Sequence, residues 1–92
     1  MNRIDKLLLL ARTNAKYSHS LICVIIPEFE SNYMLKITLQ KQSEIVESCN
    51  EYFSNKEQCE SYITEYCNCH GLTENNTLLL ILNVSAAENE VQ

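Results

Sequence analysis

The chain has very few of the residues that build tight turns. Its 92 residues include one glycine and one proline. Two-residue hairpin turns usually recruit glycine, because their central positions need a positive φ. The composition therefore argues against a fold made of many tight hairpins. The turns are expected to rely on asparagine and serine instead, at residues 30–32, 40–43 and 73–77.

Long apolar runs are also missing. Residues 7–11 are too short for the apolar region of a secretory signal, and Asp5 interrupts the basic residues before them. No run approaches the roughly 20 residues of a membrane span. We therefore expect a cytoplasmic protein without a membrane partner. In that compartment its five cysteines should be reduced, and their odd number fits poorly with a disulfide framework; they are Cys23, Cys49, Cys59, Cys67 and Cys69.

The composition is that of one small globular domain, with 46% apolar and 21% charged residues. We expect this domain to span residues 1–85, followed by a polar tail over residues 86–92. The net charge of −5 is unevenly placed: residues 1–16 carry four basic and one acidic residue (+3), and the rest carry three basic and eleven acidic residues (−8). The acidic balance makes nucleic acid an unexpected partner.

Residues 3–16 have the spacing of an amphipathic helix. Asn2 can cap this helix, and apolar residues recur every three or four positions, namely Ile4, Leu7, Leu8, Ala11 and Ala15. On a helical wheel Leu9 falls opposite this stripe and Leu10 lies at its flank. We predict that Leu9 points away from the helix's own core.

Four segments are predicted to be strands. Residues 21–26 are an unbroken apolar run, which indicates a strand with both faces covered. Residues 33–40 alternate, which predicts one wet face bearing Met34, Lys36, Thr38 and Gln40. Residues 44–53 alternate less cleanly and predict an irregular strand at the sheet edge. Residues 77–84 form a last strand, apolar on both faces.

A second helix is predicted after residue 54. Ser54 and Glu57 have the spacing of a capping box, and Gly71 can supply the left-handed residue that ends the helix. Between them, one face collects the apolar and aromatic residues together with one histidine: Cys59, Tyr62, Ile63, Tyr66, Cys67 and His70.

The predicted order is α-β-β-β-α-β, an α+β domain with a four-stranded mixed sheet. The second helix makes a right-handed crossover, which sets the last strand parallel to a neighbour, and we take this neighbour to be the first strand. We expect both helices to pack on one face; a three-layer domain with one helix on each face is the alternative. With both helices on one face, the sheet keeps an uncovered apolar surface, the usual mark of an interface. With the first helix, the candidates are Leu9, Leu10, Ile22, Val24, Ile26, Leu79 and Ile81.

Chemistry-bearing motifs are scarce. Cys67, Cys69 and His70 are a possible metal cluster, but Cys67 and Cys69 would point about 200° apart on a helix, so we expect no metal and no cofactor. His19 and His70 sit in no catalytic motif, and a chain with a single glycine has no glycine-rich loop or nucleophile elbow. We therefore expect no enzymatic activity and no catalytic residues.

The opening Met-Asn-Arg-Ile-Asp-Lys-Leu-Leu, the three strands, the entry Phe53, Ser54 and Glu57 into a tyrosine-rich helix, and the last apolar strand resemble a group of small proteins of unknown function encoded by phages and prophages of Firmicutes. The resemblance implies an accessory role in a mobile element and no activity. We therefore predict a protein-interaction module that forms homodimers. The alternative is an inhibitor of a host nucleic-acid-binding protein that acts through its acidic surface. Metal or thiol chemistry at Cys67, Cys69 and His70 is the third hypothesis.

Overall fold

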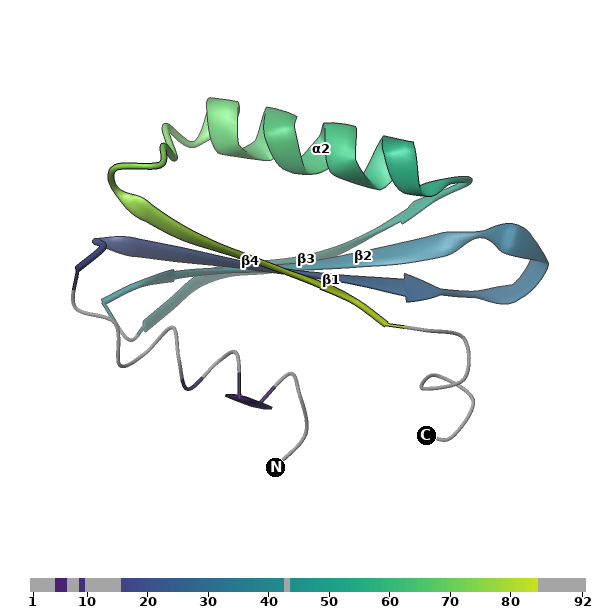
Figure 1. Ribbon diagram of the computed structural model, residues 1–92, viewed down its shortest axis with the longest axis horizontal. Helices are drawn as coiled ribbons and strands as arrows, with labels where there is room; N and C mark the ends of the chain where they lie inside the picture. The colour runs from purple at the N-terminus through teal and green to yellow at the C-terminus, as the bar shows by residue number, and fades with distance from the viewer. Residues whose placement is uncertain (1–4, 7–8, 10–15, 43, 85–92) are drawn as a thin grey trace.

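The computed structural model describes residues 5–6, 9, 16–42 and 44–84. Along these residues run β1 (His19–Pro27), the short 3-10 turn η1 (Phe29–Ser31), β2 (Tyr33–Lys41), β3 (Glu44–Phe53), α2 (Lys56–Cys69) and β4 (Thr77–Asn83). The strands form one sheet, and α2 lies across one of its faces (Figure 1). The α+β class is confirmed. The predicted tail and most of the predicted first helix lie outside the described residues, although Asp5, Lys6 and Leu9 are helical.

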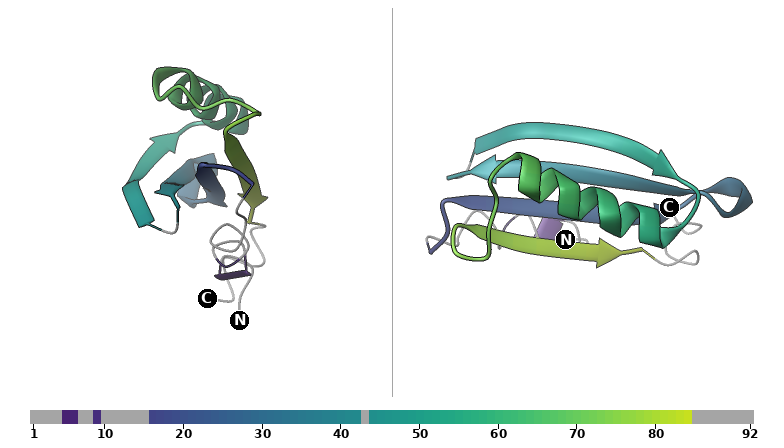
Figure 2. Two further views of the ribbon diagram at one scale, coloured as in Figure 1. Left: turned by 90° about the vertical axis from the view of Figure 1, so that its left-hand side faces the viewer. Right: turned by 90° about the horizontal axis from the view of Figure 1, so that it is seen from above.

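The strand order in the sheet is β3-β2-β1-β4. β1 and β2 are antiparallel, as are β2 and β3, whereas β1 and β4 run parallel. Figure 2 shows that the connection from β3 through α2 to β4 passes over the sheet as a right-handed crossover. The predicted parallel pairing of the last strand with the first is therefore confirmed, as is the position of the irregular third strand at an edge.

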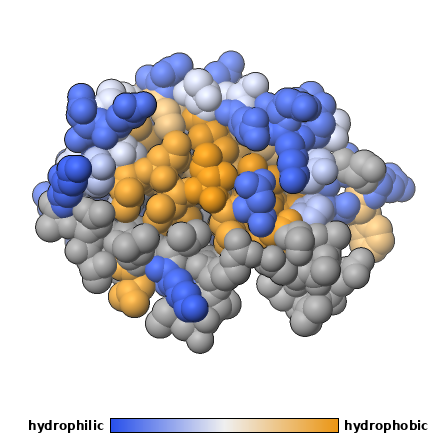
Figure 3. Space-filling view, in the orientation of Figure 1, coloured by the Kyte–Doolittle hydropathy of each residue, from blue (hydrophilic) through white to orange (hydrophobic). Residues whose placement is uncertain are grey.

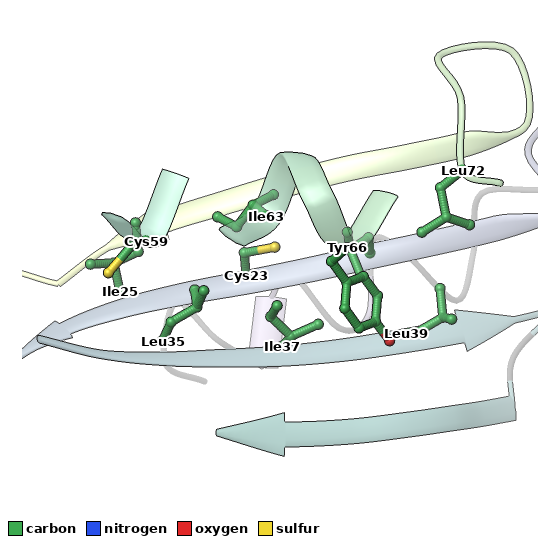
Figure 4. Packing of buried hydrophobic residues seen from close by; sticks show 10 residues of the cluster. Cys23, Ile25, Leu35, Ile37, Leu39, Cys59, Ile63, Tyr66 and Leu72 are labelled. Atoms are coloured by element: carbon green, nitrogen blue, oxygen red, sulfur yellow. The ribbon is translucent and has the colours of Figure 1, made fainter. Parts of the chain in front are cut away.

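The main core lies between α2 and the sheet. Alternate residues of β1 and β2 point to this side, because successive side chains of a strand face opposite ways. They meet the buried face of α2, where Cys59, Ile63 and Tyr66 were expected (Figure 4). The complete buried set is Leu21, Cys23, Ile25, Leu35, Ile37, Leu39, Cys59, Ile63, Tyr66 and Leu72.

The second face of the sheet is also covered. Ile22 and Val24 are each only 2% exposed, and they pack with Leu82 in a second buried cluster. The described N-terminal pieces, residues 5–6 and 9, lie on this side (Figures 1 and 2). The expectation that both helices share one face does not fit this placement, because a strand that is apolar on both sides needs cover on both.

The predicted wet face of β2 is wrong over half of its length. Lys36 is exposed there, but Thr38 is buried and Gln40 is only 2% exposed. Both amide atoms of Gln40 are buried, and no described residue forms a hydrogen bond with them. The alternation of residues 33–40 is real, but its polar half faces the covered second side of the sheet.

The start of α2 is one residue later than the capping box predicted. Asn55 is the N-cap, and its side-chain oxygen accepts the backbone N–H of Gln58 at 2.9 Å. The Gln58 amide oxygen in turn accepts the backbone N–H of Ser54 at 2.9 Å. The reciprocal pair is therefore Asn55 with Gln58 in place of Ser54 with Glu57. Asparagine is at least as good an N-cap as serine, so the two adjacent candidates could not be separated by residue type.

The end of α2 is as predicted. Gly71 has a φ of 66°, in the left-handed region. The N–H of Leu72 donates to the carbonyl of Cys67 and that of Gly71 to the carbonyl of Asn68, which is the Schellman pattern. The turn sends the buried Leu72 back into the main core.

The N-cap hydrogen bond of Asn55 leads to a prediction about stability. Replacing Asn55 with alanine should lower the free energy of unfolding by about 1 kcal/mol, because an N–H of the first turn loses its partner. Replacing Ser54 with alanine should leave it nearly unchanged, since only the backbone of Ser54 takes part. Chemical denaturation followed by circular dichroism measures both, and the reverse ranking would restore Ser54 as the cap.

Candidate interaction surface

The candidate interface residues are divided between the two faces of the sheet. In the parallel register Leu21 aligns with Leu79 and Ile22 aligns with Leu80, and aligned residues share a face. Leu79 and Ile81 therefore lie on the α2 side, whereas Ile22, Val24 and Ile26 lie on the second side. These five predicted candidates therefore do not share one face of the sheet.

Their exposure separates the candidates further. Leu79 is 45% and Ile81 47% exposed, whereas Ile22 and Val24 are buried and Ile26 is half-buried. Leu9 is 50% exposed, in line with its predicted outward direction. Leu10 lies outside the described residues. Two of the seven candidates, Leu79 and Ile81, are thus accessible on a described strand.

Leu79 and Ile81 are exposed because α2 covers β4 only in part. The helix packs on β1, β2 and β3, and one helix is too narrow for a face of four strands about 4.8 Å apart. Figure 3 shows the result as a continuous hydrophobic area along β4, bordered by hydrophilic residues on α2. We call this area, with Leu79 and Ile81 at its centre, the β4 surface.

A groove continues the β4 surface toward the C-terminal half of α2. It has a volume of about 510 Å³. Ile63 and Cys67 of α2 form one wall, Leu79 lies on the other, and Leu72 joins them. The groove has no catalytic arrangement: its one ionisable acid is Glu74, and no histidine lines it. Its shape and composition suit contact with another apolar surface.

Two exposed aromatic residues were not singled out from the sequence. Phe29 is 90% exposed in the turn between β1 and β2, and Tyr52 is 67% exposed at the far end of β3. Both line a shallow depression with Phe53. The available signal was a phenylalanine between Glu28 and Glu30, directly before the predicted turn at residues 30–32, because flanking charges and a turn place a side chain at the surface.

A small polar cluster fastens the end of α2 to the edge strand β3. The Tyr66 hydroxyl donates to Glu47 Oε2 at 2.5 Å, and His70 Nε2 lies 3.3 Å from the same oxygen. The rings of Tyr66 and His70 stack at 4.0 Å between centroids. Burial raises the pKa of Tyr66 well above its usual range, and the hydrogen bond and charge of Glu47 raise it further. The hydroxyl is therefore neutral near pH 7 and acts as a clamp.

Removing this clamp should have a pH-dependent effect on stability. At about pH 7, Tyr66→Phe is expected to lower the free energy of unfolding by about 1–2 kcal/mol, because the carboxylate of Glu47 loses its donor. The raised pKa of Tyr66 adds stability that is complete below the unfolded value of 10.0 and falls as pH rises through the folded value. The gap between wild type and variant should therefore shrink above about pH 10.

Denaturation at neutral and alkaline pH measures this gap. Tyr52→Phe is the matched control, because its exposed ring on β3, the strand of Glu47, should give no such change. A gap for Tyr66→Phe that stays constant or widens at alkaline pH would contradict the assignment of the clamp.

Four of the five cysteines show little nucleophilic character. Burial raises the pKa of Cys23 to about 12 and also raises the pKa of Cys49, Cys59 and Cys67. These four thiols keep their protons at neutral pH, and the thiolate is the reactive form. All five cysteines are free.

The possible metal cluster is not assembled on the described part of the chain. Cys67 is half-buried on the groove side of α2, whereas Cys69 is exposed. Among residues 16–42 and 44–84, with 5–6 and 9, no three His, Cys, Asp or Glu side chains come together as metal ligands. That the protein carries no metal stays a prediction. The same residues include no helix with the length and hydrophobicity needed to cross a membrane.

Comparison with known proteins supports the fold and nothing more specific. No protein-family model matches the chain, and no curated protein matches it significantly. Among solved structures it is similar to a protein of unknown function with an actin-like ATPase fold from Bacteroides thetaiotaomicron VPI-5482, with a TM-score of 0.65 and 8% identity. The match covers 96% of this chain and 32% of the other, so this chain spans about a third of that length. At this identity the likeness concerns the fold alone.

Proposed function

We propose that this protein is a non-enzymatic interaction module that binds a second copy of itself through the β4 surface. The observation that carries the proposal is the exposure of Leu79 and Ile81, at 45% and 47%, on a strand without a charged residue. Apolar side chains grouped in this way on a soluble domain usually mark an interface.

A second copy is the occupant that the residues favour. A two-fold interface needs only one self-complementary patch, and homodimers are the commonest oligomers. The β4 surface is uncharged, so two copies meet there without burying a charge. The exposed glutamates of β3 lie at the opposite edge of the sheet from β4, so they do not oppose the contact at short range.

Sedimentation equilibrium tests the proposal directly. The mass should rise with concentration from 10.6 kDa toward twice that value within the micromolar range. A mass that stays at the monomer value up to high micromolar concentration would overturn self-association.

The setting we propose is a phage or other mobile element. It rests on the resemblance of the chain's opening, of its three strands and of the entry into α2 to small prophage-encoded proteins. The arrangement of genes around the coding sequence tests this part separately, because a neighbourhood of housekeeping genes would argue against it.

A second candidate function rests on the acidic side of the molecule. Glu47 and Glu51 of β3 project on the α2 side of the sheet. Burial first, and then the charges of Glu51 and Glu47, raise the pKa of Tyr62, which lines a shallow depression with Glu57 and Glu65 of α2. In this function the acidic side occupies the basic cleft of a host nucleic-acid-binding protein. Its test is release of such a host protein from DNA, with a Glu47→Gln and Glu51→Gln double variant as the weakened control.

A further inference from the structure

The two edges of the sheet are built differently. The β3 edge carries Glu44, Glu47 and Glu51, and it has a bulge where Leu39 pairs with Glu47 and Gln40 with Ile45. Charges and bulges are the usual means by which an edge strand avoids pairing with another chain. The β4 edge has neither: its sequence is TLLLILN, and its register with β1 is unbroken.

The backbone of β4 is oriented for pairing on its outer side. The N–H of His19 donates to the carbonyl of Asn76, and the N–H of Val84 donates to the carbonyl of Ile25. In a parallel ladder every second residue bonds the same neighbour, so the even-numbered residues from 76 to 84 face β1. Leu79 and Ile81 therefore direct their N–H and C=O groups outward, where no described strand pairs with them.

We infer that β4 pairs antiparallel with β4 of a second copy, with Leu80 facing its own copy across the two-fold axis and Leu79 facing Ile81. This inference rests on the proposed function and specifies the geometry of its interface. In this register the whole strand overlaps, because Thr77 then lies opposite Asn83. Leu79 and Ile81 are both outward-bonding residues, so they exchange N–H···O=C bonds with each other across the interface.

Neighbouring registers are poorer. If the axis passes through Ile81, Leu79 faces the polar Asn83, and the strands no longer overlap fully. A shift that sets an outward-bonding residue opposite an inward-bonding one removes the hydrogen bonds. Only the register centred on Leu80 matches backbone groups over all seven residues of β4 and sets its five apolar residues opposite one another.

The size of the contact sets its strength. Seven strand residues span about 23 Å, and pairing them buries on the order of 400 Å² from each subunit, about half of a standard interface. Main-chain hydrogen bonds supply affinity in strand addition. The dimer should therefore be reversible, with a dissociation constant in the micromolar range.

A proline at residue 81 tests the backbone part of the interface. Because the Ile81 N–H points outward, Ile81→Pro removes a bond of the dimer and none of the ladder to β1, and proline is tolerated at such edge positions. The variant should be monomeric with an unchanged circular dichroism spectrum. Ile81→Ala shortens the same side chain but keeps the N–H, so it should weaken the dimer less than proline does.

Cysteine cross-linking tests the register and does not depend on the stability of the proline variant. With the exposed Cys69 replaced by serine in both proteins, Leu80→Cys should form an intermolecular disulfide readily, because the Cα atoms of facing residues that are not hydrogen-bonded lie about 4.5 Å apart. Leu78→Cys, on the same face but facing Leu82, should not.

The outcomes separate the two proposals. A wild-type dimer that persists in Ile81→Pro, or in which Leu80→Cys fails to cross-link, overturns the strand pairing and leaves self-association standing. A monomeric wild type overturns both.

Discussion

Replacing Leu79 with aspartate is expected to raise the dissociation constant of the dimer by about 100-fold or more. In the monomer this side chain is half-exposed, so the folded chain tolerates a carboxylate there. In the dimer it meets apolar side chains of the second copy, and the desolvation of an unpaired carboxylate is costly. The change occurs twice in a two-fold dimer, and sedimentation or light scattering measures it.

Val46→Asp is the matched control for this variant. Val46 is 59% exposed on β3, the opposite edge of the sheet. Its replacement also turns an exposed aliphatic side chain into a carboxylate, but at a position outside the proposed dimer contact. Its dissociation constant should be close to that of the wild type. Equal effects of the two aspartates would show that general charge, and not the β4 surface, governs association.

Replacing Gln40 with leucine is expected to raise the free energy of unfolding by about 1–3 kcal/mol. Both amide atoms of Gln40 are buried without a partner among the described residues, so no described group replaces the bonds to water that folding removes. Leucine has a similar volume and no polar atoms. Chemical denaturation should show a higher midpoint with an unchanged slope.

Gln40→Ala separates removal of the amide from filling of the space. It relieves the same unpaired groups but leaves a cavity, whose cost offsets the gain. Leucine should therefore be clearly more stable than alanine at this position. If Gln40→Leu destabilises the protein, the amide has a partner in solution and the residue serves a purpose beyond packing.

Local signals predicted the elements well. The run at residues 21–26, the alternation at 33–40 and the double apolar step Ile45-Val46 fixed the strands and the irregular edge, because each depends on neighbours in the chain. The face of α2 and its end at Gly71 followed from helical spacing in the same way. The N-cap was displaced by one residue, since Ser54 and Asn55 are chemically equivalent candidates.

The faces of the sheet could not be predicted as well, for a physical reason. Whether Leu79 shares a side with Leu21 or with Ile22 depends on the register between β1 and β4, and a slip of one residue reverses every side chain. Both strands are apolar on both faces, so hydrophobicity could not select the register. For that reason the prediction grouped Leu79 and Ile81 with Ile22 and Val24, although the first two are exposed and the other two are buried.

The charged and bulged β3 edge of the sheet determines how many copies can assemble. When two copies join through β4, both free edges of the resulting eight-stranded sheet are β3 strands, each with its bulge and its glutamates. A third copy then finds no flat, uncharged strand to extend, so growth stops at two and does not continue into a filament. Loss of the three β3 glutamates would leave the β4 contact in place, although it would also remove the acceptor of the Tyr66 hydroxyl, and only the bulge would then hinder the addition of a third copy.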